Sequence, residues 1–230
     1  MGFIKKIICL ANSRHNGFCI AGRELLNNRI GEWVRPVSKR EKGELSLKDI
    51  CFSDREVPKI LDIISIPLLE YTPQSRLSDS IPHQSENYLI NNKEYWTKVA
   101  EYKNDDLSIL CDEVDSIWKN GYRSSYGLND RIPVYILKQK INSSLLLIKP
   151  DIMLINVVDE RNRKRVRAYF TFNEIEYNLV VTDIHIEKVF LNANYGEYNI
   201  TDFDIYLCIS LGEIYYGYAY KLVAGIINLL

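Results

Sequence analysis

The stretch "RVRAYFTFNEIEYNLVVTD", residues 165–183, has the pattern of a β-hairpin. Two runs rich in aromatic and β-branched residues flank Asn173-Glu174, and apolar side chains recur at every second position. A tight turn at these two residues pairs positions whose numbers sum to 347. One face of the hairpin then consists of three cross-strand pairs, which we predict to be buried: Phe170 with Tyr177, Ala168 with Leu179, and Val166 with Val181.

The opposite face of this hairpin is polar and aromatic. It carries Arg165, Arg167, Tyr169 and Thr171, and its first residues belong to the basic run "RNRKRVR" at 161–167, which has five cations. Single-strand binders combine phosphate attraction with base stacking, and a cationic loop leading to Arg and Tyr supplies both. We therefore expect this segment to bind nucleic acid, the alternative being a hairpin tip that is basic only because it is solvated. The candidate residues are Arg161, Arg163, Lys164, Arg165, Arg167 and Tyr169.

The elements around this hairpin follow a recognisable order. A strand over 145–158, interrupted at Lys149-Pro150, precedes it, and a short helix from Thr182 or Asp183 toward Leu191 follows it. Strands over 203–210 and 215–227, predicted as a hairpin around Gly212, complete the set. Three strands, a helix and two strands is the order of an oligonucleotide/oligosaccharide-binding (OB) barrel.

The first half of the chain repeats this order. Strands over 3–11 and 18–24 flank Asn16-Gly17, a strong hairpin-turn dipeptide, and a third strand covers 32–37. Ser46 can cap a short helix, with Asp49 three residues further on. The remaining strands are expected over 60–71 and within 95–102.

A connector is expected between the two halves. Apolar residues at helical spacing from Leu107 to Trp118 predict a helix that Asn104 or Asp105 caps and Gly121 ends. The predicted fold is mainly β: two OB-like five-stranded barrels, at 1–103 and 144–230, joined by a helical and loop segment at 104–143.

Candidate binding residues also occur in the first barrel. Arg14 and His15 lie in the turn between its first two strands, the position that 161–165 occupies in the second barrel. They are unlike a catalytic pair, because adjacent hairpin residues diverge and no third group orients the histidine. Trp33 and Arg35 are two apart and share a side of one strand, where they can hold a ring between them. Alternatively, Trp33 is core and Arg35 satisfies the backbone of the next loop.

Composition bounds the remaining possibilities. The chain has 230 residues, a hydrophobic content of 47% and a formal charge of −1, which by itself indicates no polyanionic partner. The charge is uneven: +5 over 1–45, −6 over 46–130 and zero over 131–230. The five cysteines show no C-x-x-C spacing, and no apolar run approaches the roughly 20 residues of a membrane helix. We expect a soluble cytoplasmic protein without a membrane partner.

The sequence offers little for catalysis or metal binding. Phosphate-loop, dinucleotide and nucleophile-elbow motifs are absent. Asp183, His185 and Glu187 alternate and would cluster only in a strand, whereas a helix cap explains them equally well. We expect no metal, no cofactor and no catalytic residue; a nuclease with dispersed carboxylates is the enzymatic alternative. The polar run "HQSEN", residues 83–87, either contacts a ligand or ties the linker to both barrels through buried hydrogen bonds.

Several segments resemble the bacterial family of dual OB domain-containing proteins. They are "KKIICLANSR", "CIAGREL", "GEWVRPVS", "HQSENYLI", "NGYRSSYGLNDR" and "YLCISLGEIYYGYAYKLVAGII", with "WVRPVS" and "HQSEN" the most specific. The resemblance implies two OB barrels and nucleic-acid binding, and it carries over no catalytic residues.

The expected function is therefore non-catalytic binding of single-stranded DNA or RNA through the barrel faces and the basic loops between strands 1 and 2. Two alternatives stay open. One is a sensor of a nucleotide-like small molecule, with Trp33 and Arg35 lining its pocket. The other is a scaffold whose aromatic C-terminal strand, "IYYGYAYK", packs on a protein partner.

Overall fold

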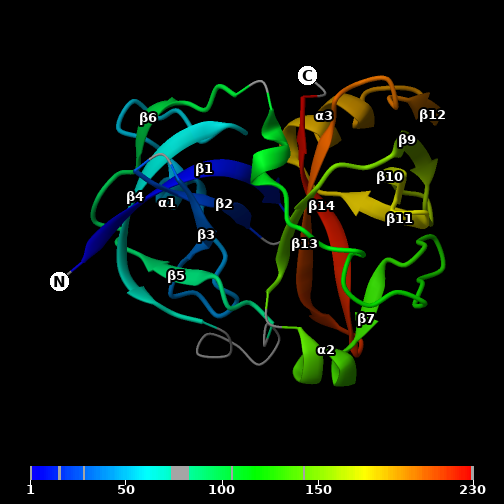
Figure 1. Cartoon of the computed structure of the whole chain (residues 1–230), viewed down its shortest axis with the longest axis horizontal. Coiled ribbons are helices and arrows are strands. Elements are labelled where there is room, and N and C mark those ends of the chain that lie inside the picture. The colour runs from blue at the N-terminus through cyan, green and yellow to red at the C-terminus, as the bar shows by residue number, and fades with distance from the viewer. Residues whose placement is uncertain are drawn as a thin grey trace. The chain divides into compact units, whose positions relative to one another are not determined.

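The computed structural model describes residues 2–14, 17–27, 29–73, 83–104, 106–141 and 143–228, without the side chains of 138–140. The protein is mainly β and divides into two compact units (Figure 1). Unit 1 comprises Met1–Leu110 with Asn142–Ser144, and unit 2 comprises Cys111–Ile141 with Leu145–Leu230. Residues 111–141 of the predicted connector are thus part of unit 2.

Unit 1 is a closed barrel. Its sheet order is β1-β2-β3-β5-β4-β6, and β1 also pairs with β4. All pairs are antiparallel except β3 with β5. The elements are β1 (Phe3–Arg14), β2 (Phe18–Leu26), β3 (Arg29–Val37), α1 (Leu47–Ile50), β4 (Asp62–Tyr71), β5 (Asn87–Ile90), β6 (Thr97–Glu101) and the 3₁₀ helix η2 (Leu107–Leu110).

One long strand closes this barrel. The first part of β1, from Phe3 to Ile8, pairs with β4, and the part from Ile7 to Arg14 pairs with β2. Alternate side chains point inward, since side chains of a strand alternate between its two faces. Together with residues of α1 and the loops they form a fully buried core that includes Ile7, Cys9, Ile20, Val34, Ile50, Ile64 and Ile66.

Unit 2 follows the same circuit with additions. Its order is β12-β9-β10-β11-β14-β13-β8, and β11 and β14 are parallel. The elements are β7 (Arg131–Pro133), α2 (Val134–Lys140), β8 (Leu145–Ile148), β9 (Ile152–Asp159), β10 (Lys164–Phe172), β11 (Ile175–Val181), α3 (Ile184–Leu191), β12 (Gly196–Asn199), β13 (Tyr206–Tyr215) and β14 (Tyr218–Ile227).

In unit 2, the predicted interruption at Lys149-Pro150 separates β8 from β9, which together correspond to the single strand β1 of unit 1. Before it, β8 pairs with β13; after it, β9 pairs with β10. Proline has no backbone N–H to give to a ladder, so the interruption is expected at such a site. The two segments together close the circuit as β1 does in unit 1. The two sheets are consistent with two OB-like domains, which confirms the predicted fold class.

The register of the β10–β11 hairpin is the predicted one. Phe170 faces Tyr177, Ala168 faces Leu179, and all four side chains are fully buried. The rings of Phe170 and Tyr177 stack with centroids 5.2 Å apart. Asn173 and Glu174 have φ of 49° and 64°, which is the conformation of a two-residue primed turn.

The predicted helix over 107–118 is wrong. Only η2 forms there, and the chain then runs beside β8, where Asp112 exchanges hydrogen bonds with Leu147 through its backbone N–H and its carboxylate. The Ile117 N–H donates to the Tyr177 hydroxyl, and Trp118 has a φ of 48°. Partners distant in sequence therefore take the backbone groups that a helix would pair internally, although Ile117 is buried as the apolar pattern required.

Two strand predictions also need correction. The fifth strand of the first barrel, expected within 95–102, is β5 at Asn87–Ile90, which begins at the last residue of the polar run 83–87; the expected stretch forms β6, which pairs with β4. The turn between β13 and β14 is at Tyr216-Gly217, with φ of 47° and 79°, and not at Gly212. Gly212 lies instead within β13, where the pairing register shifts, as is common for glycine inside a strand.

An additional strand occupies the seam between β11 and β14. We call residues 128–133 the inserted strand: Leu128 exchanges backbone hydrogen bonds with Asn178 of β11, and β7 pairs with β14. Its Asp130 carboxylate accepts hydrogen bonds from the N–H and hydroxyl of Ser124, at 2.7 and 2.5 Å. Position 127 has to be glycine, since a Cβ there would lie 1.8 Å from the Asp130 carboxylate.

Beside the inserted strand lies a buried lysine, Lys221 of β14, whose side chain is 1% exposed. Its ammonium donates to Asn120 Oδ1 at 2.8 Å and lies 5.3 Å from the centroid of the Tyr177 ring. Burial lowers the pKa of Lys221 to about 7, and the negative charge of Asp130 limits the decrease. The fold thus contains a lysine that titrates near neutrality.

We predict that Lys221→Met changes how stability depends on pH. The folded protein releases the Lys221 proton near pH 7, whereas the unfolded chain keeps it until near the ordinary value of 10.5. Between these values the unfolded state binds one more proton, so this group makes the unfolding free energy rise with pH, by up to about 1.4 kcal/mol per unit. In urea unfolding from pH 7.5 to 9.5, the unfolding free energy of Lys221→Met minus that of wild type should therefore decrease as the pH rises. A constant difference between the two proteins would contradict the assignment.

Candidate nucleic-acid interface

Trp33 and Arg35 of β3 share a face, as predicted, but both are buried. Their exposed fractions are 7% and 6%, while Val34 between them points into the core. The cation over the Trp33 ring is Arg23, at 5.0 Å from the centroid. These two side chains therefore present no open slot between a ring and a guanidinium.

Arg35 belongs to a buried polar network within unit 1. Its Nε lies 3.3 Å from Glu86 Oε1, and its Nη2 donates to the Ser144 hydroxyl at 2.8 Å. The Ser144 hydroxyl in turn donates to the Glu86 carboxylate, and the Arg35 N–H donates to the Glu86 carbonyl at 2.8 Å. The role of Arg35 is thus structural, but its side chain joins β3 to the Glu86 and Ser144 side chains and not to the backbone of the next loop, which was the alternative interpretation.

The polar motif at 83–87 contributes to this network. His83, Gln84, Glu86 and Asn87 are all buried, and the Asn87 amide donates to Gln84 Oε1 at 3.2 Å. Buried polar groups must be hydrogen-bonded to be tolerated, which explains the density of polar residues here. The motif acts as internal structure of unit 1.

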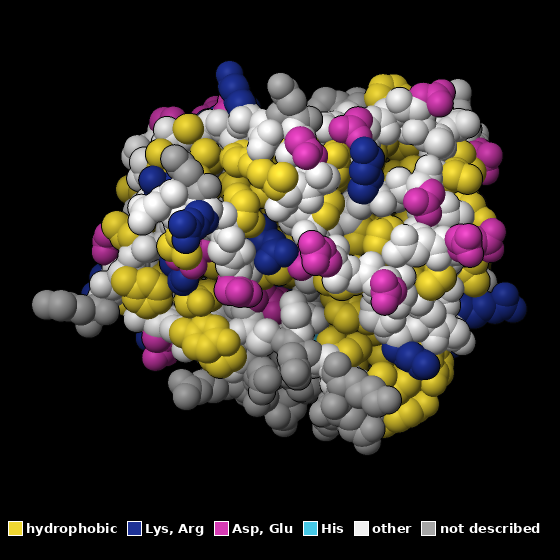
Figure 2. All heavy atoms as spheres, in the orientation of Figure 1, with side chains coloured by type: hydrophobic (Ala, Val, Ile, Leu, Met, Phe, Trp, Pro, Cys, Tyr) yellow, Lys and Arg dark blue, Asp and Glu magenta, His cyan; other side chains and the backbone are white. Residues whose placement is uncertain are grey.

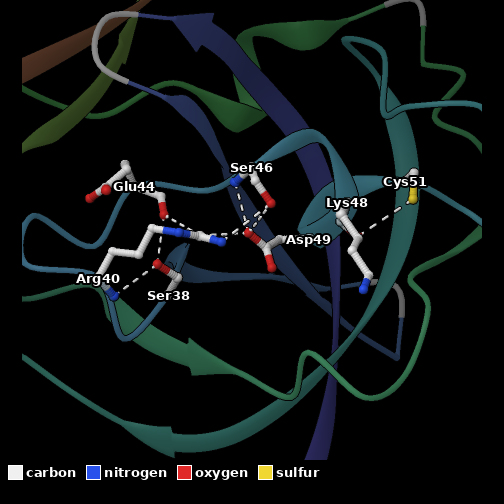
Figure 3. A network of polar contacts seen from close by, with 7 residues as sticks. All are labelled: Ser38, Arg40, Glu44, Ser46, Lys48, Asp49 and Cys51. Atoms are coloured by element: carbon white, nitrogen blue, oxygen red, sulfur yellow. Dashed lines mark hydrogen bonds and ion pairs between the residues drawn. The ribbon is translucent and has the colours of Figure 1, made fainter.

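At the first turn of unit 1, only part of the predicted site is described. Arg14 is exposed, with its guanidinium 5.4 Å from the Phe18 ring centroid, and His15 lies outside the described residues. The nearby Arg40 is held by Asp49, to which it donates at 2.6 Å, and by the Glu44 carbonyl (Figure 3). Burial disfavours the Asp49 carboxylate, but hydrogen bonds from Ser46 and Arg40 outweigh it and keep the pKa below the ordinary value. Arg40 therefore secures the start of α1, whose predicted Ser46–Asp49 capping box is present.

In unit 2, the turn between β9 and β10 presents basic side chains. The backbones of Glu160 and Arg163 pair, leaving Arg161 and Asn162 as a two-residue turn with φ of 53° and 63°. Arg161 and Arg163 are both exposed. The tip of this hairpin thus holds two solvated guanidinium groups.

The other three cations of the basic run have local partners. Lys164 donates to the Ala193 carbonyl and lies 5.0 Å from the Tyr195 ring centroid. Arg167, 4% exposed, forms an ion pair with Glu160 and donates to the Asn178 carbonyl at 3.0 Å. Burial raises the pKa of the Glu187 carboxyl, and the positive charge of half-buried Arg165 limits the rise. The structure therefore separates the run into two exposed arginines and three supporting cations.

The sheet face below this turn is mixed in character. Arg165, Arg167 and Tyr169 lie opposite three residues of β9: Val158, Asn156 and Leu154. Tyr169 is half-buried, and its hydroxyl donates to Glu176 Oε1 at 2.6 Å, which raises the pKa of the tyrosine. A ring held in this way can accept a stacked group on the face that it leaves open.

The tip of the β13–β14 hairpin was not predicted to be a turn, although its residues belong to the stretch "IYYGYAYK" that was the candidate protein-contact strand. Tyr215 and Tyr216, 63% and 84% exposed, form the tip of the β13–β14 hairpin. Placing the turn at Gly212 put both residues inside a strand. The signal that identifies them is Gly217, which follows Tyr216 directly and supports a two-residue turn.

The described residues show no metal centre: no three His, Cys, Asp or Glu side chains among them gather to hold an ion. Asp183 instead caps α3, accepting from the N–H groups of His185 and Ile186 at 2.9 and 3.0 Å and from Ile226 N–H at 3.1 Å. Within the same residues, every helix is too short or too polar to span a bilayer.

In each unit, five strands form a closed circuit in which the third and the fifth strand are parallel: β3 and β5 in unit 1, and β11 and β14 in unit 2. This arrangement defines a protein of two OB-like domains. The chain belongs to the Dual OB-containing domain (DuOB) family, whose model matches residues 5–226. This confirms the resemblance found in the sequence. Comparisons with curated proteins and with solved structures give no match. OB folds commonly bind nucleic acids.

We predict that Arg35→Ala strongly destabilises the protein. The substitution leaves the Glu86 carboxylate buried without its cation, and breaking a buried ion pair in this way costs about 3–5 kcal/mol. Chemical unfolding should show this loss, whereas the exposed control Arg14→Ala should stay within about 0.5 kcal/mol of wild type.

The double variant Arg35→Met with Glu86→Leu tests the cause of this loss. Removing both charges leaves neither one unpaired, so the double variant should be more stable than Arg35→Ala. If Arg35→Ala unfolds like wild type, the buried network does not have the role assigned to it.

Proposed function

We propose that this protein binds single-stranded nucleic acid without catalysing a reaction, and that unit 2 provides the binding surface. The observation that carries the proposal is the β9–β10 turn, where Arg161 and Arg163 are exposed at the loop between the first two strands of an OB-like barrel. In OB folds this loop borders the face that binds oligonucleotides.

The arrangement of the basic run supports a phosphate-binding role. Arg161 and Arg163 extend into solvent, and half-buried Lys164 and Arg165 add positive charge at the start of β10, whereas Glu160 compensates the charge of buried Arg167. Guanidinium groups bind phosphate through paired N–H donors, and neutralised phosphates release counterions to solution. Tyr169 lies further along the same strand face, where a base that follows the bound phosphates can reach its ring.

Unit 1 offers less support for binding either nucleic acid or a nucleotide-like small molecule. A nucleotide-like ligand between Trp33 and Arg35 would have to displace the contacts of two buried side chains and leave Glu86 unpaired. Such a rearrangement carries a large penalty, because unpaired buried charges are strongly unfavourable. We therefore favour nucleic-acid binding by unit 2 over small-molecule sensing by unit 1.

Fluorescence anisotropy with a labelled single-stranded oligonucleotide tests the proposal. Affinity should fall steeply as salt increases, and Arg161→Ala with Arg163→Ala should reduce the slope of log K against log salt by about 1.4, roughly 0.7 for each lost phosphate contact. The result should be the same for DNA and RNA if the contacts are to phosphates alone.

A matched control keeps this measurement specific. Lys48→Ala with Lys59→Ala removes the same charge from exposed positions of unit 1, and it should leave the slope unchanged. An equal decrease in both double variants would show that only net charge matters. Wild-type protein that binds no oligonucleotide at low salt would refute the proposal.

A further inference from the structure

We infer that the tip of the β13–β14 hairpin is a second contact point for nucleic acid, at which unpaired bases stack on Tyr215 and Tyr216. This inference rests on the proposed function and adds to it a base-binding element. We call Tyr215, Tyr216 and Tyr218 the tyrosine tip. Tyr216 is 84% exposed and Tyr215 63% exposed, and their rings meet edge to face with centroids 4.4 Å apart.

The backbone conformation at the tip, with positive φ, is unfavourable for a tyrosine. Tyr216 and Gly217 form a two-residue turn with φ of 47° and 79°. Both positions of such a turn favour Asn, Asp or Gly, and a bulky side chain at positive φ is uncommon because its Cβ crowds the backbone. At 84% exposure, the Tyr216 ring has little burial to offset this cost. The ring contributes little to the stability of the fold, so we look for its role outside the fold.

The other two-residue turns of the same sheet provide an internal comparison. The β10–β11 turn has Asn173 at the equivalent position, with a φ of 49°. The β9–β10 turn has Arg161 there, with a φ of 53°. Each of the three turns has one residue that positive φ favours, Asn173, Asn162 or Gly217, and one that it disfavours, Glu174, Arg161 or Tyr216. Of these three disfavoured residues, Tyr216 is the one with an aromatic ring, and it lies at the turn that joins strands 4 and 5 of the barrel.

The surroundings of the tip fit a polyanion with flat rings. The Arg131 guanidinium lies 4.1 Å from the centroid of the Tyr218 ring, and the hydroxyls of Tyr122 and Tyr135 are 3.1 Å apart close by, on the segments that flank β7. The start of α2 is joined to the turn by a hydrogen bond from Val134 N–H to the Gly217 carbonyl. Figure 2 shows hydrophobic side chains, the class that includes tyrosine, gathered at this end of the hairpin beside a basic one.

The size of the tip favours bases over a protein partner. A standard protein interface buries about 800 Å² on each side, far more than the side chains of one hairpin tip provide. A single exposed ring is enough to stack one base, and stacking tolerates any base because each has a π face. Arg131 adds a cation suited to the neighbouring phosphate.

The decisive variant is Tyr216→Asn, which replaces the ring with a residue that the turn favours. We expect its melting temperature to be equal to or above that of wild type, while its affinity for a single-stranded oligonucleotide falls about 5- to 150-fold, the loss expected for one stacked base. The slope of affinity against salt should not change, because no cation is removed. Tyr216→Trp, which retains a stacking ring, should bind at least as well as wild type.

Two controls separate stacking from other effects. Tyr95→Asn removes a tyrosine of unit 1 that is 61% exposed, and it should bind like wild type. An oligonucleotide whose bases are replaced by abasic sites should bind wild type and Tyr216→Asn equally, since nothing is left to stack.

The outcomes distinguish this inference from the proposed function. If Tyr216→Asn binds like wild type while Arg161→Ala with Arg163→Ala reduces the salt slope as expected, the tip is not a contact but the proposed function stands. If Tyr216→Asn is less stable than wild type, or loses affinity equally on the abasic strand, the stacking role is overturned. If wild-type protein binds no oligonucleotide, both fail, and the tip is left to a protein partner.

Discussion

The parallel pairing of the third and fifth strands is the constraint on which each barrel depends. Such pairs join segments that are distant in sequence, and no tight turn can set their register. In unit 1 a buried ion pair supports this seam, because Arg35 on β3 contacts Glu86 just before β5 through both its backbone and its side chain. In unit 2 the parallel contact is limited to Val180 and Val181 against Leu222 and Val223, and the inserted strand occupies the rest of the seam.

These two ways of stabilising the seam between the third and fifth strands have different consequences for binding. Stabilising the seam of unit 1 uses the polar side chains of β3 internally, so the residues that resembled a ligand slot are buried. In unit 2 the seam is closed by main-chain pairing and by the Asp130 network, and the turns at its ends are left exposed. A fold that occurs twice in one chain can thus be structural in one copy and carry the candidate interface in the other.

The basic run shows how a charge cluster is divided by tertiary structure. In sequence, its five cations are equivalent. In the folded protein, Arg167 stabilises the hairpin through Glu160 and the Asn178 carbonyl, Lys164 anchors the segment after α3, and the two arginines at the tip reach solvent. The supporting cations set the position of the exposed ones, which is a general requirement for a preorganised binding site.

Residues close together in the chain specify the local structure of the protein: the β10–β11 register, the Ser46–Asp49 capping box, the Asp183 cap and the break at Lys149-Pro150 all depend on such neighbours. The same patterns predicted the order of three strands, a helix and two strands in the second barrel, the family and the basic run as a candidate site, but not the strands β5, β7 and β12. Contacts between distant segments of the fold determine that Leu107–Trp118 is mostly not helical, that Asn87–Ile90 forms a strand and that Arg35 is buried. The physical reason is the same in each case. The partners that decide these outcomes, among them Leu147, Tyr177 and Ser144, are distant in sequence, and alternation or helical spacing carries no information about them.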